Sequence, residues 1–159
     1  MRVTVTTKGN SIEAQTDLIG SKLRELKSDV LVGLSDVISS QSPLDSGTYA
    51  ISHKVTAGRG APSGVKTRNP DAKRMSRDGV AQYPNARQQG FQNMVGEINS
   101  IDMDSDVFVI SNPMDYAALI EARVTGKKTG GSPPPYASAV REAPRIIQEV
   151  AQRIASRNR

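Results

Sequence analysis

Residues 16–40 read TDLIGSKLRELKSDVLVGLSDVISS, and this stretch decides the fold of the chain. An apolar side chain recurs at every third or fourth position, which places these side chains on one face of a helix. The members of this stripe are Ile19, Leu23, Leu26, Val30, Leu34 and Val37. Thr16 can cap the start, and Pro43 disfavours helical geometry in the residue before it. The pattern predicts a long helix from Thr16 to Ser40.

Three short stretches around this helix have patterns typical of strands. Apolar and polar residues alternate in residues 1–7 and again in residues 49–55, and a strand with one buried face has this period of two. Residues 107–110 read VFVI, a continuous apolar run that Ser111-Asn112-Pro113 ends. Such a run is typical of a buried strand.

Two more segments return to a helical period. Phe91, Met94, Val95 and Ile98 predict a second helix within residues 85–100. A C-terminal helix is predicted from a third stripe, which consists of Val140, Ala143, Ile147, Val150 and Ile154. Pro144 either begins this helix or kinks it. Residues 116–124 fit a helical turn or a strand equally well.

The element order is strand and helix, three times over, without an internal repeat. This order predicts an α+β fold in which one domain spans residues 1–159. A small mixed or antiparallel sheet would pack against the long N-terminal helix and the C-terminal helix. Apolar residues make up 36% and aromatic residues only 4%, so the core must be thin and contacts with other subunits could add stability.

The net charge of the chain belongs to one segment. Residues 57–90 hold seven basic and two acidic residues, which accounts for the whole formal charge of +5. Gly and Pro interrupt residues 57–85, so we expect a long, basic, flexible loop there and a second loop at residues 125–135. The candidate interaction residues are Arg59, Lys66, Arg68, Lys73, Arg74, Arg77, Lys127 and Lys128. They could contact phosphates or an acidic protein surface, or form a solvated arm.

No pattern of catalytic or metal-binding residues is evident. The chain has no Cys, which excludes disulfides and thiolate metal sites. Its one histidine, His53, is interpreted as a half-buried structural residue. Residues 102–106 resemble the start of a calcium loop, but Val107 and Pro113 occupy the positions that need Gly and Glu. Residues 60–67 lack the spacing of a phosphate-binding loop. We therefore predict no catalytic residue, no metal and no cofactor.

The sequence also bears on location. No apolar run approaches the ~20 residues that span a bilayer, and residues 1–5 lack the apolar region of a secretory signal. We expect a soluble protein, made in the cytoplasm, with no membrane partner.

Three segments, taken in order, resemble one known family. Residues 42–49 read SPLDSGTY, residues 107–121 read VFVISNPMDYAALIE, and residues 134–155 begin with PPYA and continue into the last helix. The chain is similar here to the tail-completion or head–tail joining proteins of long-tailed phages, of the minor tail protein Z type. The family-motif residues are Pro43, Asp45, Gly47, Asn112, Tyr116, Ala117 and Glu121. One departure is Arg123, where the family often has Gly.

The resemblance implies a virion protein at the head–tail junction, present in the host cytoplasm during assembly. It would form a ring, by resemblance a hexamer, between an adjacent neck or connector ring and the tail tube or terminator proteins. Asp45 and Asn112 are residue types that satisfy backbone groups, and Tyr116 suits a core edge or a subunit contact. A family defined by such residues selects for a shape rather than for catalysis.

Three alternatives stay open at this stage. Within the same class, the protein could be a tail terminator or a head-closure protein. A more distant alternative is a small basic protein that binds DNA without sequence specificity, and a ring subunit could itself touch DNA in its lumen through the basic loop. An enzyme is the third class, and no constellation of residues favours it.

Overall fold

The architecture comes from a computed structural model, which describes residues 12–43, 47–59, 85–115, 117–122 and 133–157. Within these ranges the elements are α1 (Ile12–Gln41), α2 (Thr48–Ile51), β1 (Lys54–Ala57), α3 (Ala86–Ile98), β2 (Phe108–Ser111), α4 (Ala117–Ala122) and α5 (Pro135–Ser156). The fold is α+β and mainly helical, with a long N-terminal helix, a C-terminal helix and a small sheet, as predicted.

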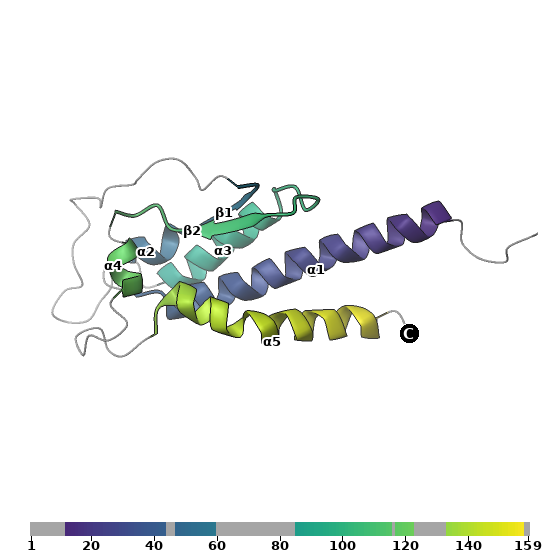
Figure 1. The fold of residues 1–159 in the computed structure, drawn as a ribbon. Coiled ribbons are helices and arrows are strands. Elements are labelled where there is room, and N and C mark those ends of the chain that lie inside the picture. The colour runs from purple at the N-terminus through teal and green to yellow at the C-terminus, as the bar shows by residue number, and fades with distance from the viewer. Residues whose placement is uncertain (1–11, 44–46, 60–84, 116, 123–132, 158–159) are drawn as a thin grey trace, which may run out of the picture.

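The described sheet has two antiparallel strands. β1 pairs with β2 in a register that sets Val55 opposite Ile110 and Lys54 opposite Ser111. Figure 1 shows the sheet above α3, with α1 below them and α5 alongside α1. Helices thus cover one side of the sheet, and α1 is the central element that contacts both α3 and α5.

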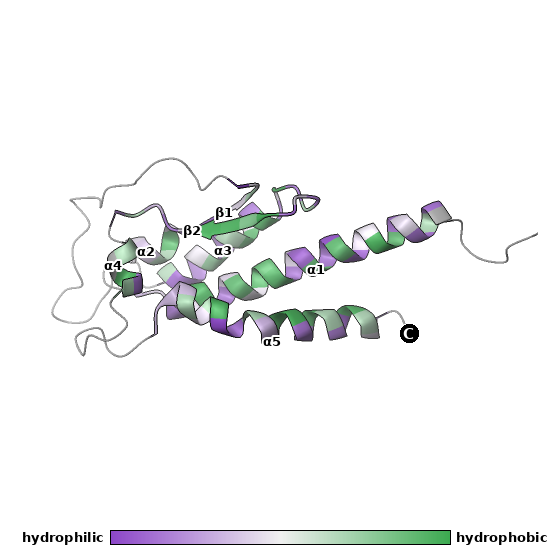
Figure 2. Ribbon diagram, viewed as in Figure 1, coloured by the Kyte–Doolittle hydropathy of each residue, from purple (hydrophilic) through white to green (hydrophobic). Residues whose placement is uncertain are grey.

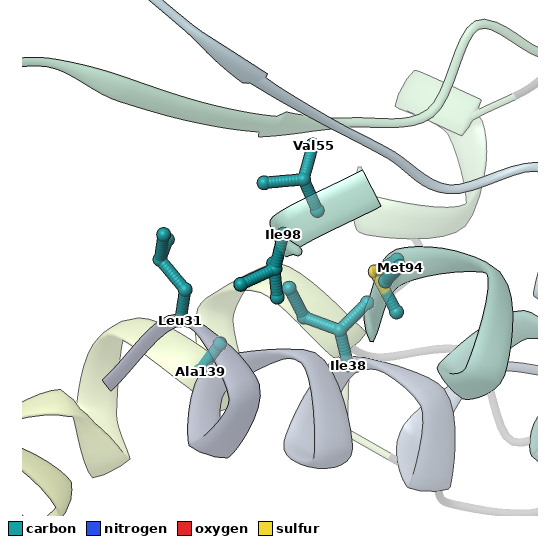
Figure 3. Close-up of a cluster of buried hydrophobic side chains, with 6 residues drawn as sticks. All are labelled: Leu31, Ile38, Val55, Met94, Ile98 and Ala139. Carbon is teal, nitrogen blue, oxygen red and sulfur yellow. The ribbon is translucent and has the colours of Figure 1, made fainter. Parts of the chain in front are cut away.

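Two apolar clusters hold these layers together. The larger one joins α1, β1, α3 and α5, and its buried members are Leu31, Ile38, Val55, Met94, Ile98 and Ala139 (Figure 3). The smaller one lies between α5 and the predicted stripe of α1. There Ile146, Val150 and Ile154 pack against Leu26, Val30, Leu34 and Val37. Each cluster joins segments distant in sequence, so burial of apolar area favours the whole arrangement rather than single elements.

The prediction for residues 49–55 was wrong in part. The chain forms the short helix α2 at Thr48–Ile51, and β1 begins only at Lys54. Gly47, at φ 80°, turns the chain into α2, a conformation that residues with a Cβ avoid. His53 is fully buried, not half-buried.

The long helices also differ from the prediction at their ends and faces. α1 begins at Ile12, so Thr16 lies inside it and cannot cap it. α5 begins at Pro135 and includes Pro144. In the predicted stripe of α5, Val140 is 75% exposed and Ile147 is 47% exposed, while Ile146 is buried instead. The two adjacent isoleucines allow two overlapping faces, and packing on α1 selects the one with Ile146.

Other predictions have simpler outcomes. α3 and β2 lie where the sequence placed them, and the ambiguous segment 116–124 is helical where it is described, as α4. The predicted strand at residues 1–7 and nearly all of the two predicted loops, 57–85 and 125–135, lie outside the described residues. At the edges of those loops, Ala57 belongs to β1 and Pro135 to α5.

Candidate functional site

The predicted interaction residues can be placed only in part. Arg59 is exposed just beyond β1. The other seven lie outside the described residues, namely Lys66, Arg68, Lys73, Arg74, Arg77, Lys127 and Lys128. Among the family-motif residues, Asp45 and Tyr116 also lie outside them. The remaining motif residues are Pro43, Gly47, Asn112, Ala117 and Glu121, and all of them belong to described segments at one end of the molecule.

A buried polar network around His53 joins the three segments that carry the resemblance. His53 Nε2 lies 2.8 Å from the hydroxyl of Ser42, which follows the end of α1. His53 Nδ1 lies 2.9 Å from the hydroxyl of Tyr136, in the first turn of α5. The rings of Tyr49 and Tyr136 both meet the imidazole edge to face. His53 and Ser42 are each 0% exposed, so the network is closed to solvent at its centre.

The hydrogen bonds determine which imidazole nitrogen carries the proton. Ser42 Oγ donates its one proton to the carbonyl of Ile38, at 2.7 Å, and can therefore only accept from His53. Nε2 must then carry the proton, which leaves Nδ1 to accept from the Tyr136 hydroxyl. This neutral form fits the burial, because desolvation lowers the pKa of His53 to about 4. Burial also raises the pKa of the Tyr136 hydroxyl, with Glu121 adding to the shift, so the phenol keeps the proton that it donates.

Asn112 and Glu121 extend the network to the second motif segment. The Asn112 amide donates to the carbonyl of Tyr49 at 2.9 Å, and its oxygen accepts from the backbone N–H of Met114 at 3.1 Å. One Glu121 oxygen accepts from the Tyr49 hydroxyl at 3.1 Å and from the backbone N–H of Tyr136 at 3.4 Å. These contacts tie α2 to the segment that precedes α4 and to α4 itself, and they tie α4 to α5.

One basic residue of the charged segment has a structural role. The Arg87 guanidinium, on α3, donates to the backbone carbonyl of Ser42 at 2.8 Å. Carbonyl groups at a helix end lack partners within the helix, and a cation there is also favoured by the helix dipole. Part of the local charge excess therefore stabilises the end of α1 and is not available for a partner.

The acidic turn at residues 102–106 also has a structural role, because it binds two basic residues of α1. Arg24 of α1 forms two hydrogen bonds with Asp104, at 2.6 and 3.1 Å, and lowers the pKa of that carboxyl. Lys27 donates to the backbone carbonyls of Met103 and Ser105 at 3.1 and 3.0 Å. The turn that resembles a calcium loop is thus a docking point for α1 on the described structure.

The geometry at Ser42 differs from that of a catalytic serine. An activated serine donates its proton to histidine, whereas here the histidine donates to Ser42 and Ser42 donates to a backbone carbonyl. His53 Nδ1 faces a tyrosine hydroxyl instead of an orienting carboxylate. The network therefore orients secondary structure, and in this arrangement it does not activate a nucleophile.

Across the described ranges, no three side chains of His, Asp or Glu gather in a way that could hold a metal ion. No helix within those ranges combines the length and the apolar character needed to cross a membrane.

Sequence reasoning missed the network itself. Ser42, Tyr49 and Tyr136 lie inside the quoted motif segments, and this was the available signal. What the sequence lacks is any local sign that they meet His53. Comparison with known proteins adds nothing here, because no protein-family model, curated protein or solved structure matches the chain.

Proposed function

We propose that this chain is a structural subunit of a tailed bacteriophage, one copy in a ring that completes the tail and joins it to the head. The observation that carries the proposal is the convergence of the three motif segments on one buried network. Ser42 and Tyr49 come from the first segment, Asn112 and Glu121 from the second, and Tyr136 from the third. Each of the three segments that carry the resemblance thus contributes residues to the network that holds the elements together.

The chemistry of this network supports a role in assembly. Its polar groups are turned toward one another and toward the backbone, and the imidazole is neutral. A fully satisfied buried network rigidifies a fold, whereas a catalytic site needs a group that can reach substrate. A rigid scaffold with long connecting segments is what a ring subunit needs when its neighbours differ on each side.

The experiment is to delete the gene from the phage or prophage genome that carries it and to examine the particles by negative-stain electron microscopy. We expect filled heads and separate tails of finished length, and restoration of virions by the wild-type gene in trans. Normal virions from the deletion strain would reject the proposal. Tails of irregular length would favour a terminator, and heads that lose DNA would favour a head-closure protein.

The second candidate, a small basic DNA-binding protein, is favoured by the charge excess in residues 57–90. It predicts tight, salt-sensitive binding of duplex DNA by the free chain. A variant with Arg68, Lys73, Arg74 and Arg77 changed to Gln should then bind far less tightly. Fluorescence anisotropy at two salt concentrations separates the candidates, because the joining role needs no DNA affinity in the free chain.

A further inference from the structure

α5 has an apolar sector that is wider than the part its described neighbours cover. Ile146, Val150 and Ile154 are buried on α1. Beside them runs a second row with helical spacing, four, three and four residues apart, whose side chains are all exposed. This row consists of Val140, Pro144, Ile147 and Ala151, and is called here the outer stripe of α5. No described part of the chain covers it.

α1 has an uncovered apolar surface of its own. Its stripe continues from Leu26 through Leu23 to Ile19, but α5 ends near the level of Glu25, where Arg157 forms an ion pair at 3.0 Å. Figure 1 shows α1 extending beyond the end of α5, and Figure 2 shows apolar residues on this extension. Ile19 is 68% exposed and Leu23 is 48% exposed. Residues 12–24 are called here the α1 overhang.

We propose that the α1 overhang of one copy packs on the outer stripe of α5 of the next copy. This inference rests on the proposed ring, whose subunit contact it assigns. The two helical segments have similar lengths, because 13 residues of helix extend about 20 Å and the 12 residues from Val140 to Ala151 extend about 18 Å. The exposed large apolar side chains of the overhang, Leu18, Ile19 and Leu23, lie within residues 18–23. Stripes at this spacing pack as helix pairs.

Charge complementarity favours a second copy as the occupant. The overhang has two exposed acidic residues near its start, Glu13 and Asp17, and two basic residues near its end, Lys22 and Arg24. The outer stripe is bordered by Arg141, whose side chain is 68% exposed and whose carboxylate contact, Glu142 at 3.6 Å, is shared with Arg145. When the two helices run parallel, the acidic start of the overhang lies beside Arg141, so the charges favour a parallel contact.

Two different surfaces meet in this contact, so it is heterologous. Repeated from copy to copy, a heterologous contact gives a ring when its rotation closes. The rival arrangement is isologous, with the α1 overhangs of two copies packed on each other. That arrangement would give a dimer and would leave the outer stripe of α5 exposed.

Complementary variants distinguish the two arrangements. The overhang variant carries Ile19→Lys and Leu23→Lys, and the stripe variant carries Val140→Lys and Ile147→Lys. A second stripe variant, Val140→Lys with Ala151→Lys, replaces the first if the half-exposed Ile147 proves necessary for folding. Circular dichroism and thermal melting establish that each variant is folded. Sedimentation velocity then gives the mass of the full-length wild-type chain, of each variant alone and of an equimolar mixture.

The heterologous contact predicts wild-type assemblies larger than the 17.1 kDa chain and monomers for each variant alone. The mixture should form one-to-one pairs, because the overhang variant keeps its stripe and the stripe variant keeps its overhang. Dimers of the stripe variant alone, a mixture that stays monomeric, or a wild-type chain that is monomeric at every concentration would each overturn it.

The outcomes for the ring and for its interface are separable. Rings of wild-type size from a variant that carries all four lysines would overturn this interface and leave the ring proposal standing. One-to-one pairs in the mixture, together with normal virions after gene deletion, would support the contact and reject the proposed function.

Discussion

Replacement of glycine by alanine should have opposite effects on stability at two positions in α3, Gly90 and Gly96. A Cβ at Gly90 would lie 1.9 Å from the carbonyl oxygen of Ala50 and 2.8 Å from its carbonyl carbon, both backbone atoms of α2. Ordinary contacts between such atoms are about 3.5 Å or more. α2 would therefore have to move away from α3 by roughly 1 Å or more. A Cβ at Gly96 would meet nothing within 4 Å.

The magnitudes follow from these distances. Overpacking costs about 3 kcal/mol when rigid backbone must move, and Ala gains about 1 kcal/mol over Gly in a helix. We expect Gly90→Ala to lower the free energy of unfolding by about 2 kcal/mol, and Gly96→Ala to raise it by about 1 kcal/mol. For a chain of this size each kcal/mol corresponds to about 2–4 °C in Tm.

Urea and thermal unfolding followed by circular dichroism measure both variants against the wild type. Gly96→Ala serves as the matched control, since it makes the same change in the same helix without the contact. Equal stability of the two variants, or a Gly90→Ala protein as stable as the wild type, would refute the close approach of α2 and α3. It would also count against the network around His53, because α2 carries Tyr49.

Three further predictions concern the network and the basic segment. The folded state keeps His53 neutral down to about pH 4, while the unfolded chain takes up a proton near pH 6.5, so acid favours unfolding. Stability should therefore fall by up to about 3 kcal/mol as the pH drops from 6.5 to 4, and urea melts of His53→Gln should lack this part of the pH dependence. Tyr136→Phe removes the nearer of the two donors to His53 Nδ1, the other being the Asn112 amide at 3.4 Å, and should cost about 1–3 kcal/mol in the same assay. Deletion of residues 60–82 should leave a cooperatively folded chain that fails to restore joining in trans, and loss of the helical circular dichroism signal would contradict this.

Local patterns in the sequence predict correctly those elements whose apolar residues fit only one period, helical or extended. α1 and α3 keep a helical period over several turns, and the apolar run before Ser111 is strand β2. α2 was not predicted, because the apolar residues Tyr49 and Ile51 also fit the period of two that is typical of a strand. In α5 the apolar sector is wide enough to hold two faces, and only contact with α1 decides between Ile146 and Ile147.

The site was predictable as a set of turn and packing residues but not as a network. Its partners are far apart in sequence, with a separation of 11 positions from Ser42 to His53 and of 83 positions from His53 to Tyr136. Side-chain hydrogen bonds between distant segments have no period, and a single histidine in an alternating stretch is most simply interpreted as part of a strand. The direction of proton donation, which separates a structural serine from a catalytic one, depends on the Ile38 carbonyl and so on the fold.

A buried polar network differs from an apolar core in what it specifies. Apolar clusters tolerate small shifts, whereas a hydrogen bond weakens over tenths of an ångström and an unmet buried donor is costly. The hydrogen bond from the Tyr136 N–H to Glu121 joins the two segments that flank residues 123–132. Arg87, just after residues 60–84, is anchored to Ser42. The network therefore holds the bases of both basic segments at set positions on a rigid body. The buried hydrogen bonds thus specify this placement, and two of the family-motif residues, Asn112 and Glu121, take part in them.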